Sequence, residues 1–91
     1  MPSNNIWTLR IDPAKNNWLE KLNEWAQIFK SSVDWEVISS TNEDKQIVHS
    51  AIPTIRGIRM SDCTGYGSSK KAAKNDAAKK LSDQERLVRY D

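Results

Sequence analysis

One stretch decides the fold of this 91-residue chain: GYGSSKKAAKNDAAKKL, from Gly65 to Leu81. Its glycines break a strand, and Ser69 suits the N-cap of a helix because a serine hydroxyl accepts a free backbone N–H. The apolar side of the predicted helix carries Ala73, Ala77, Ala78 and Leu81. Because most of these side chains are small, we expect a helix that begins near Ser69 and packs very close to its neighbour.

The same stretch concentrates positive charge. The net charge of the chain is only +2, and Lys and Arg are slightly outnumbered by acids up to residue 64. Residues 65–80 then hold five lysines (Lys70, Lys71, Lys74, Lys79 and Lys80) and one acid, Asp76. A helix N-terminus attracts anions through its free N–H groups and its dipole. Lys70 and Lys74 share one face and Lys71 flanks it, while Gly65 and Gly67 leave room for close backbone approach. We therefore predict a phosphate site here, with a solvated helix face as the alternative.

A first helix is predicted well upstream of this stretch. Asp12 suits an N-cap and Pro13 suits the first helical position. Apolar residues then recur at helical spacing: Trp18, Leu19, Leu22, Trp25, Ala26 and Phe29. The spacing predicts a helix from about Pro13 to Lys30. Its core-facing residues would be Trp18, Leu22, Trp25 and Phe29, which meet Ala73, Ala77 and Leu81 of the second helix.

The segment between the helices predicts an antiparallel meander of three strands. The strands are the residues around Trp35 and Val37, then 47–55, then 58–64, joined by the polar turn 41–45 and by Arg56-Gly57. Pro53 has no N–H, so it must lie at a sheet edge or at a position that donates no hydrogen bond to a neighbouring strand. We expect His49 to pack against the core or its edge. The predicted fold class is α+β, in the order α-β-β-β-α, with both helices packed on one face of a three-stranded sheet.

The two ends of the chain flank one domain, predicted over residues 13–82. Residues 1–12 form an N-terminal extension, and three interpretations fit Ile6 to Ile11 equally: an extra strand, a docked arm or a frayed terminus. Residues 83–91 form a short C-terminal helix or tail. Ser82 to Glu85 resembles a capping box, which favours a short helix through Leu87 and Val88, although the segment also fits a continuation of the preceding helix.

The quoted stretch resembles the second-helix motif of double-stranded RNA-binding domains, Gly-x-Gly-x-Ser-Lys-Lys-x-Ala-Lys-x-x-Ala-Ala, and every position of that motif is filled. Leu22-Asn23-Glu24-Trp25 is similar to the Leu-Asn-Glu-aromatic segment of the family's first helix. The resemblance covers about residues 13–82. It implies a domain that binds A-form RNA over about 16 bp, largely without regard to base sequence.

The resemblance also implies roles for individual residues. Lys70, Lys71 and Lys74 would contact phosphates across the major groove. Glu24 would accept hydrogen bonds from ribose 2′-hydroxyls, and Glu20, one turn earlier, would face the same minor groove. The first loop of the sheet departs from the family, because Asn42 to Lys45 stands in place of a Gly-Pro-x-His element, with Lys45 at the position of the histidine. The predicted RNA-binding residues are Glu20, Glu24, Asn42, Lys45, Lys70, Lys71 and Lys74.

Other classes of function find little support in the sequence. One histidine and one cysteine lie far apart, and no nucleophile elbow, zinc spacing, P-loop or dinucleotide loop occurs, so we predict no catalysis, cofactor or metal. Cys63 is interpreted as a spectator thiol. No apolar run suits a membrane span, so we expect an intracellular protein without a membrane partner. The alternative to RNA binding is a protein-interaction or homodimerisation module that uses Ile6, Trp7, Leu9 and Ile11. The lysines disfavour that alternative, because members of the family that lose RNA binding usually lose them.

Overall fold

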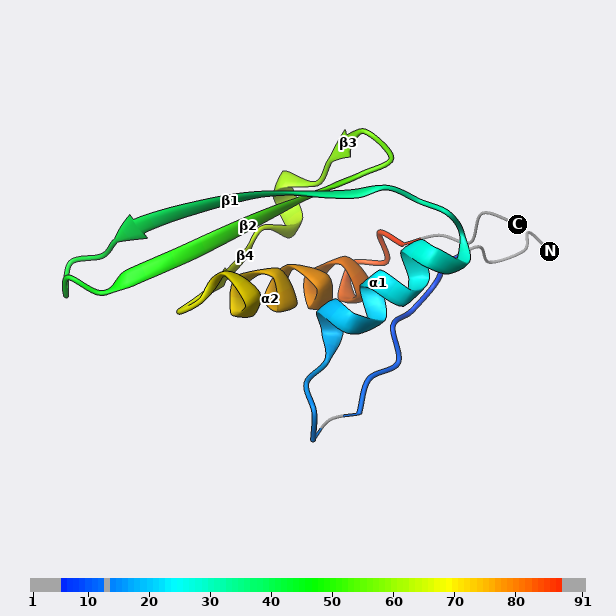
Figure 1. The fold of residues 1–91 in the computed structure, drawn as a ribbon, viewed down its shortest axis with the longest axis horizontal. Coiled ribbons are helices and arrows are strands. Elements are labelled where there is room, and N and C mark those ends of the chain that lie inside the picture. Colours follow the sequence, from blue (N-terminus) through cyan, green and yellow to red (C-terminus); the bar gives the residue numbers. More distant parts are fainter. Residues whose placement is uncertain (1–5, 13, 88–91) are drawn as a thin grey trace.

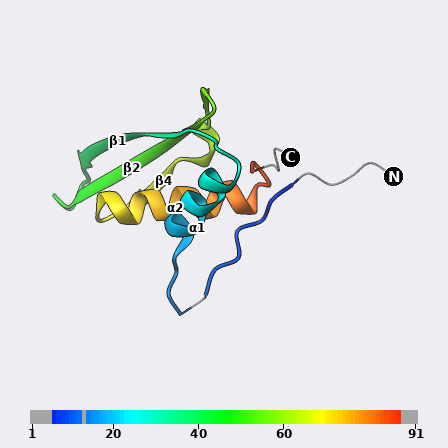
Figure 2. The same ribbon diagram turned by 45° about the vertical axis from the view of Figure 1, so that its right-hand side comes forward.

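The computed structural model describes residues 6–12 and 14–87, whose elements follow the predicted order (Figure 1). They are α1 (Trp18–Ile28), β1 (Val33–Thr41), β2 (Ile47–Ile55), β3 (Ile58–Arg59), a 3-10 helix (Ser61–Cys63), β4 (Gly65–Gly67) and α2 (Lys70–Asp83). In the described sheet β2 is central, with β1 antiparallel on one side and β3 and β4 antiparallel on the other. Both helices lie on one face of the sheet (Figures 1 and 2). The predicted α+β fold is confirmed.

The long β1–β2 hairpin forms the frame of the sheet. Its pairs run without interruption from Val33 opposite Ile55 to Thr41 opposite Ile47. Alternate residues of a strand share a face, so the half-buried Trp35 and the buried Pro53 lie opposite each other on the side of the helices. His49 lies further along that side, half-buried, with Nδ1 2.7 Å from the hydroxyl of its cross-strand neighbour Ser39. It therefore packs at the edge of the core.

The single third strand predicted over 58–64 is wrong, because two short strands share that position beside β2. Two residues separate Ala51 from Thr54 on β2, whereas five separate their partners Gly65 and Arg59. The 3-10 helix takes up the excess. The glycines of Gly65–Gly67, which were expected to break the strand, instead form β4 themselves.

Pro53 accounts for the position of this interruption. Its carbonyl accepts a hydrogen bond from the Met60 N–H at 2.8 Å, so its backbone faces the third strand position. Proline has no N–H to donate, and a continuous strand opposite it would lack one ladder bond. The prediction that Pro53 lies where no donated bond is needed is confirmed. The adjoining turn, Arg56-Gly57, has positive φ at both residues (53° and 81°), as a two-residue type I′ hairpin requires.

The first helix begins at Trp18, later than the predicted start at Pro13, and Pro13 lies outside the described residues. Asp12 does cap a turn, since its Oδ1 accepts the Ala14 N–H at 3.0 Å and its carbonyl accepts the N–H of Asn16 at 3.1 Å. That turn is not continued, because Asn16 adopts a left-handed conformation with φ 48°. The chain changes direction at Asn16, and α1 begins separately at Trp18.

At the C-terminal end, α2 continues through Ser82 to Asp83, which was one of the two interpretations of this segment. Ser82 is buried inside the helix and does not begin a new one. Glu85 has φ 57°, its N–H bonds the Ser82 carbonyl, and the Arg86 N–H bonds the Leu81 carbonyl at 2.9 Å. This is a Schellman termination, which turns the chain back toward the core. Leu87 is accordingly buried outside any helix, and Val88 lies outside the described residues.

The N-terminal segment from residue 6 to residue 12 is a docked arm, one of the three structures that fitted the sequence, and residues 1–5 lie outside the described residues. The Leu9 N–H donates to the Ser82 hydroxyl at 3.0 Å, and the Trp7 N–H donates to the Leu87 carbonyl at 2.9 Å. The Trp7 ring packs edge-on against Phe29, with ring centroids 5.4 Å apart. The arm therefore bonds to the segment that follows α2, so the two ends of the described chain lie together.

The core lies between the helices and the sheet. Of the residues predicted to fill it, Leu22, Trp25, Ala73, Ala77 and Leu81 are buried, whereas Trp18 and Phe29 are half-buried at its margin. Leu9 and Leu87 also belong to the core and were not predicted. Cys63 is a buried free thiol, and burial raises its pKa while the positive charge of Lys80 opposes the rise.

We expect Trp25→Ala to lower the free energy of unfolding by about 3–5 kcal/mol, because Trp25 is only 1% exposed and its removal leaves a large cavity. Chemical denaturation measures the change. The matched control is Ile38→Ala on the open face of β1, 48% exposed in the parent, for which the change should stay within about 0.5 kcal/mol. Equal effects of the two substitutions would show that α1 buries a different face.

We expect Gly65→Ala to destabilise the fold by about 3 kcal/mol or more, because the added Cβ would lie 2.2 Å from both the Ala73 carbonyl oxygen and the Ala77 nitrogen. Both neighbours are backbone atoms of α2, so neither can rotate away. The control is Gly57→Ala, where the Cβ would meet no described atom within 4 Å and only the positive φ adds strain, about 1–2 kcal/mol. A smaller loss at Gly65 than at Gly57 in thermal unfolding would contradict this packing.

Candidate nucleic-acid interface

The start of α2 is fixed by a cap and carries exposed cations. The Ser69 hydroxyl accepts the Ala72 N–H at 3.0 Å, and the Ser69 carbonyl accepts the Ala73 N–H at the same distance. The N–H groups of Lys70 and Lys71 stand at the helix end, where no preceding turn supplies carbonyls. Both lysine side chains are exposed. The start of α2 therefore combines the partial positive charge of a helix N-terminus with the charges of two ammonium groups.

Lys74 is held differently from its two neighbours. Its side chain is half-buried, and its ammonium nitrogen lies 5.9 Å from the centre of the Trp35 ring on β1. A cation over an aromatic face is attracted by the ring's negative charge. Lys74 is thus oriented toward the sheet, whereas Lys71 lines a groove between the two helices. We refer below to Lys70, Lys71 and Lys74 as the lysine cluster.

The opposite wall of that groove is the polar side of α1. Glu20 and Glu24, both exposed, lie one turn apart and line the groove together with Lys71. Each carboxylate has a light local contact: Glu20 accepts a 3.4 Å bond from the Asn17 amide, and Glu24 pairs with Lys21 at 3.2 Å. Exposed pairs of this kind contribute little energy, so both carboxylates remain available as acceptors.

The β1–β2 loop is shaped by Asn42. Its side-chain carbonyl accepts the N–H groups of Asp44 at 3.0 Å and Gln46 at 2.9 Å, and Lys45 takes a left-handed conformation with φ 62°. The Asn42 carbonyl is therefore used within the loop, and the exposed Lys45 ammonium is its cationic group. The loop lies at the same end of the molecule as the start of α2 (Figure 1). The groove unites Glu20, Glu24 and Lys71, while Asn42 and Lys45 stand apart at the hairpin tip.

The sequence model of the double-stranded RNA binding motif matches residues 18–83. The chain belongs to this family. The match extends from the first residue of α1 to the last residue of α2. A comparison with curated proteins found no match. The resemblance inferred from the sequence is confirmed, and what the family match identifies is a non-catalytic binding domain.

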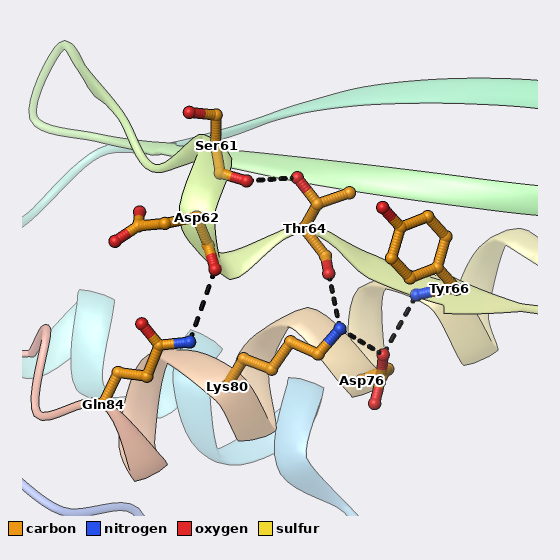
Figure 3. Close-up of polar contacts among 7 residues, drawn as sticks. All are labelled: Ser61, Asp62, Thr64, Tyr66, Asp76, Lys80 and Gln84. Carbon is orange, nitrogen blue, oxygen red and sulfur yellow. Dashed lines mark hydrogen bonds and ion pairs between the residues drawn. The ribbon is translucent and has the colours of Figure 1, made fainter.

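Lys80 of this double-stranded RNA-binding domain has a structural role that its sequence position does not reveal. Its ammonium group donates to the Thr64 carbonyl at 2.7 Å, pairs with Asp76 at 3.3 Å and lies 4.9 Å from the centre of the Tyr66 ring (Figure 3). Asp76 in turn accepts the Tyr66 N–H at 3.0 Å. These contacts fasten α2 to β4 and the preceding turn. Lys80 is therefore no simple surface cation, and only Lys79 of the last two lysines suits a control.

Sequence analysis also missed Asn75. It lies one turn after Lys71 on α2, lines the same groove, and its side chain reaches the start of α1. The available signal was positional: residues four apart share a helix face, so a polar residue four positions after Lys71 faces whatever Lys71 faces.

Neither a metal centre nor a membrane span emerges from the described residues of the domain. Among residues 6–12 and 14–87, no three His, Cys, Asp or Glu side chains gather in a way that could bind a metal ion. In the same ranges, neither helix has the length and apolar character needed to cross a bilayer.

We expect the triple substitution Lys70→Ala, Lys71→Ala and Lys74→Ala to weaken binding to duplex RNA and to flatten its salt dependence. Each lost phosphate contact lowers the slope of log affinity against log salt by roughly 0.7–0.9, so the triple variant should lose roughly 2–3. The fold should persist, because the lost contact of Lys74 with Trp35 is worth only about 0.5–1 kcal/mol.

Titrations at several salt concentrations measure both quantities. Lys79→Ala is the control, since Lys79 is exposed on α2 more than one turn beyond Lys74, the last residue of the cluster. If the folded triple variant keeps the affinity and salt slope of the parent, the lysine cluster is only a solvated face.

Proposed function

We propose that this domain binds double-stranded RNA by its A-form shape and its phosphates, largely without regard to base sequence. The observation that carries the proposal is the groove between the helices, where the cation Lys71 lies among the acceptors Glu20 and Glu24. Phosphates need cations and ribose 2′-hydroxyls need acceptors, and duplex RNA presents 2′-hydroxyls in its minor groove next to the phosphates that border the major groove. DNA presents only the phosphates.

The proposed contacts follow from the chemistry of each group. The lysine cluster and the amino end of α2 would bind phosphate oxygens across the major groove, because they combine charge with free N–H donors. Glu20 and Glu24 would accept from 2′-hydroxyls in one minor groove. Asn42 and Lys45 would contact a second minor groove from the hairpin tip. The side chains proposed for contact at the helices and at the hairpin tip would meet phosphates and sugars, so base sequence should matter little.

The alternative function, a protein-interaction or dimerisation module, has less support than RNA binding, because its proposed surface is partly covered. Leu9 is 4% exposed, and Trp7 is half-buried against Phe29. These two side chains hold the arm to its own domain, whereas Ile6 and Ile11 are half-buried. We therefore favour RNA as the partner, and we propose no catalytic role for the domain.

We expect an RNA duplex of about 20 bp to bind at least roughly tenfold more tightly than the matched DNA duplex or either single strand, because DNA lacks the 2′-hydroxyl donors. Fluorescence titrations at one salt concentration measure the ratio. A second RNA duplex of scrambled sequence is the control, and its affinity should agree within about twofold. Equal affinity for the RNA and DNA duplexes would contradict the proposed mode of binding.

A further inference from the structure

The amino end of α1 is held by a residue of α2. The Asn75 side-chain carbonyl accepts the Leu19 N–H at 2.9 Å, and its amide donates to the Asn16 carbonyl at 2.9 Å. Leu19 is in the first turn of α1, where N–H groups have no partner within the helix. Asn75 therefore caps a helix from 56 residues away in the sequence.

The residue at the N-cap position of α1 does not perform this task. Among the described residues, the Asn17 side chain makes no capping bond, and its amide donates instead to Glu20. The preceding turn ends at Asn16 with a positive φ, so the chain reaches α1 at a sharp angle. Asn75 bonds the bend itself at Asn16 and the first turn of the helix at Leu19. It thereby fixes the direction in which α1 starts.

The position of Asn75 connects this bond to the groove. Asn75 and Lys71 share one face of α2, and both line the groove opposite Glu20 and Glu24. The later part of α1 has its own anchors, because Leu22 and Trp25 are buried in the core. In the first turn, which contains Glu20, Trp18 and Leu19 are half-buried and Asn75 bonds the Leu19 N–H. Asn75 therefore links the turn that carries Glu20 directly to the helix that carries Lys71.

We propose that Asn75 is a positioning residue that sets the spacing between the acceptors of α1 and the cations of α2, and thereby the preference for RNA over DNA. The inference rests on the proposed function. Phosphates along the duplex stand at fixed distances from the 2′-hydroxyls, so one rigid domain satisfies both only when its two helices keep one spacing. Asn75 touches no phosphate in this scheme and acts through the placement of Glu20.

We expect Asn75→Ala to reduce the RNA-to-DNA affinity ratio roughly three- to tenfold, the range of a lost hydrogen bond, without changing the salt slope. The lysine cluster remains in place, so phosphate contacts persist on both duplexes. A double-mutant cycle separates positioning from general weakening of the fold. In a Glu20→Ala background, Asn75→Ala should change the ratio by less than about twofold, because the acceptor that it positions is gone.

Two further variants complete the test. Asn75→Asp keeps an acceptor for the Leu19 N–H but loses the amide that donates to the Asn16 carbonyl, so its RNA-to-DNA ratio should lie between those of Asn75→Ala and the parent. Gln84→Ala is the matched control, since Gln84, the C-cap residue of α2, also has an amide that donates to a backbone carbonyl, that of Asp62 in the 3-10 helix and not one near α1's start (Figure 3). It should leave the ratio unchanged. Circular dichroism and thermal unfolding verify that each variant is folded.

The possible failures are distinguishable. If the parent binds RNA and DNA duplexes equally, the proposed function fails and this inference fails with it. If the parent prefers RNA and folded Asn75→Ala keeps the full ratio, the function stands and Asn75 has no positioning role. Should Asn75→Ala not fold, Asn75→Asp and its cycle with Glu20→Ala decide: a ratio in Asn75→Asp equal to that of the parent, or an equal effect in both backgrounds, overturns the inference.

Discussion

The close contact between β4 and α2 is the constraint on which the rest of the domain depends. A Cβ at Gly65 would lie 2.2 Å from two backbone atoms of α2, and one at Gly67 would lie 2.7 Å from the Ala73 nitrogen. Only glycine allows a strand and a helix to approach so closely. The glycines thus serve helix packing. The contact places the start of α2 just beyond β4, which is where the lysine cluster lies.

Polar bonds on two sides of α2 complete this placement. On one side Asp76 and Lys80 bind β4 and the residue before it, and on the other side Asn75 binds the start of α1. Apolar packing alone would let helices with small side chains slide or rotate, since such contacts have little direction. Hydrogen bonds of fixed length and angle restrict that freedom. The domain therefore presents its charged groups from two helices whose relative position is closely defined.

The sequence predicted those elements whose signals are local. The α2 motif, the turn at Arg56-Gly57 and the buried face of α1 all follow from residue type and period, and the structure has them. The errors arose where distant residues compete with local signals. Asp12 caps a turn that Asn16 ends, and Ser82 uses its hydroxyl for Leu9, 73 residues away, instead of capping a new helix. Pro53 did carry the signal for the split third strand. Its missing N–H in a central strand favours an interruption of the neighbouring strand at that position.

In the candidate site too, the sequence identified the types of the residues but not the role of each one. Sequence identified the lysines of α2 as a group, but their partners differ: Lys71 lines the groove, Lys74 lies over Trp35, and Lys80 is bound to Thr64 and Asp76. Helical period explains the difference, because residues 71 and 75 share the face toward α1 whereas 76 and 80 share the face toward β4. Which lysines are available for phosphate therefore follows from the neighbours of α2 in the fold. A motif that counts lysines finds the helix proposed to bind RNA, and only the packing of that helix separates the cations proposed for RNA contact from Lys80, which holds α2 to β4.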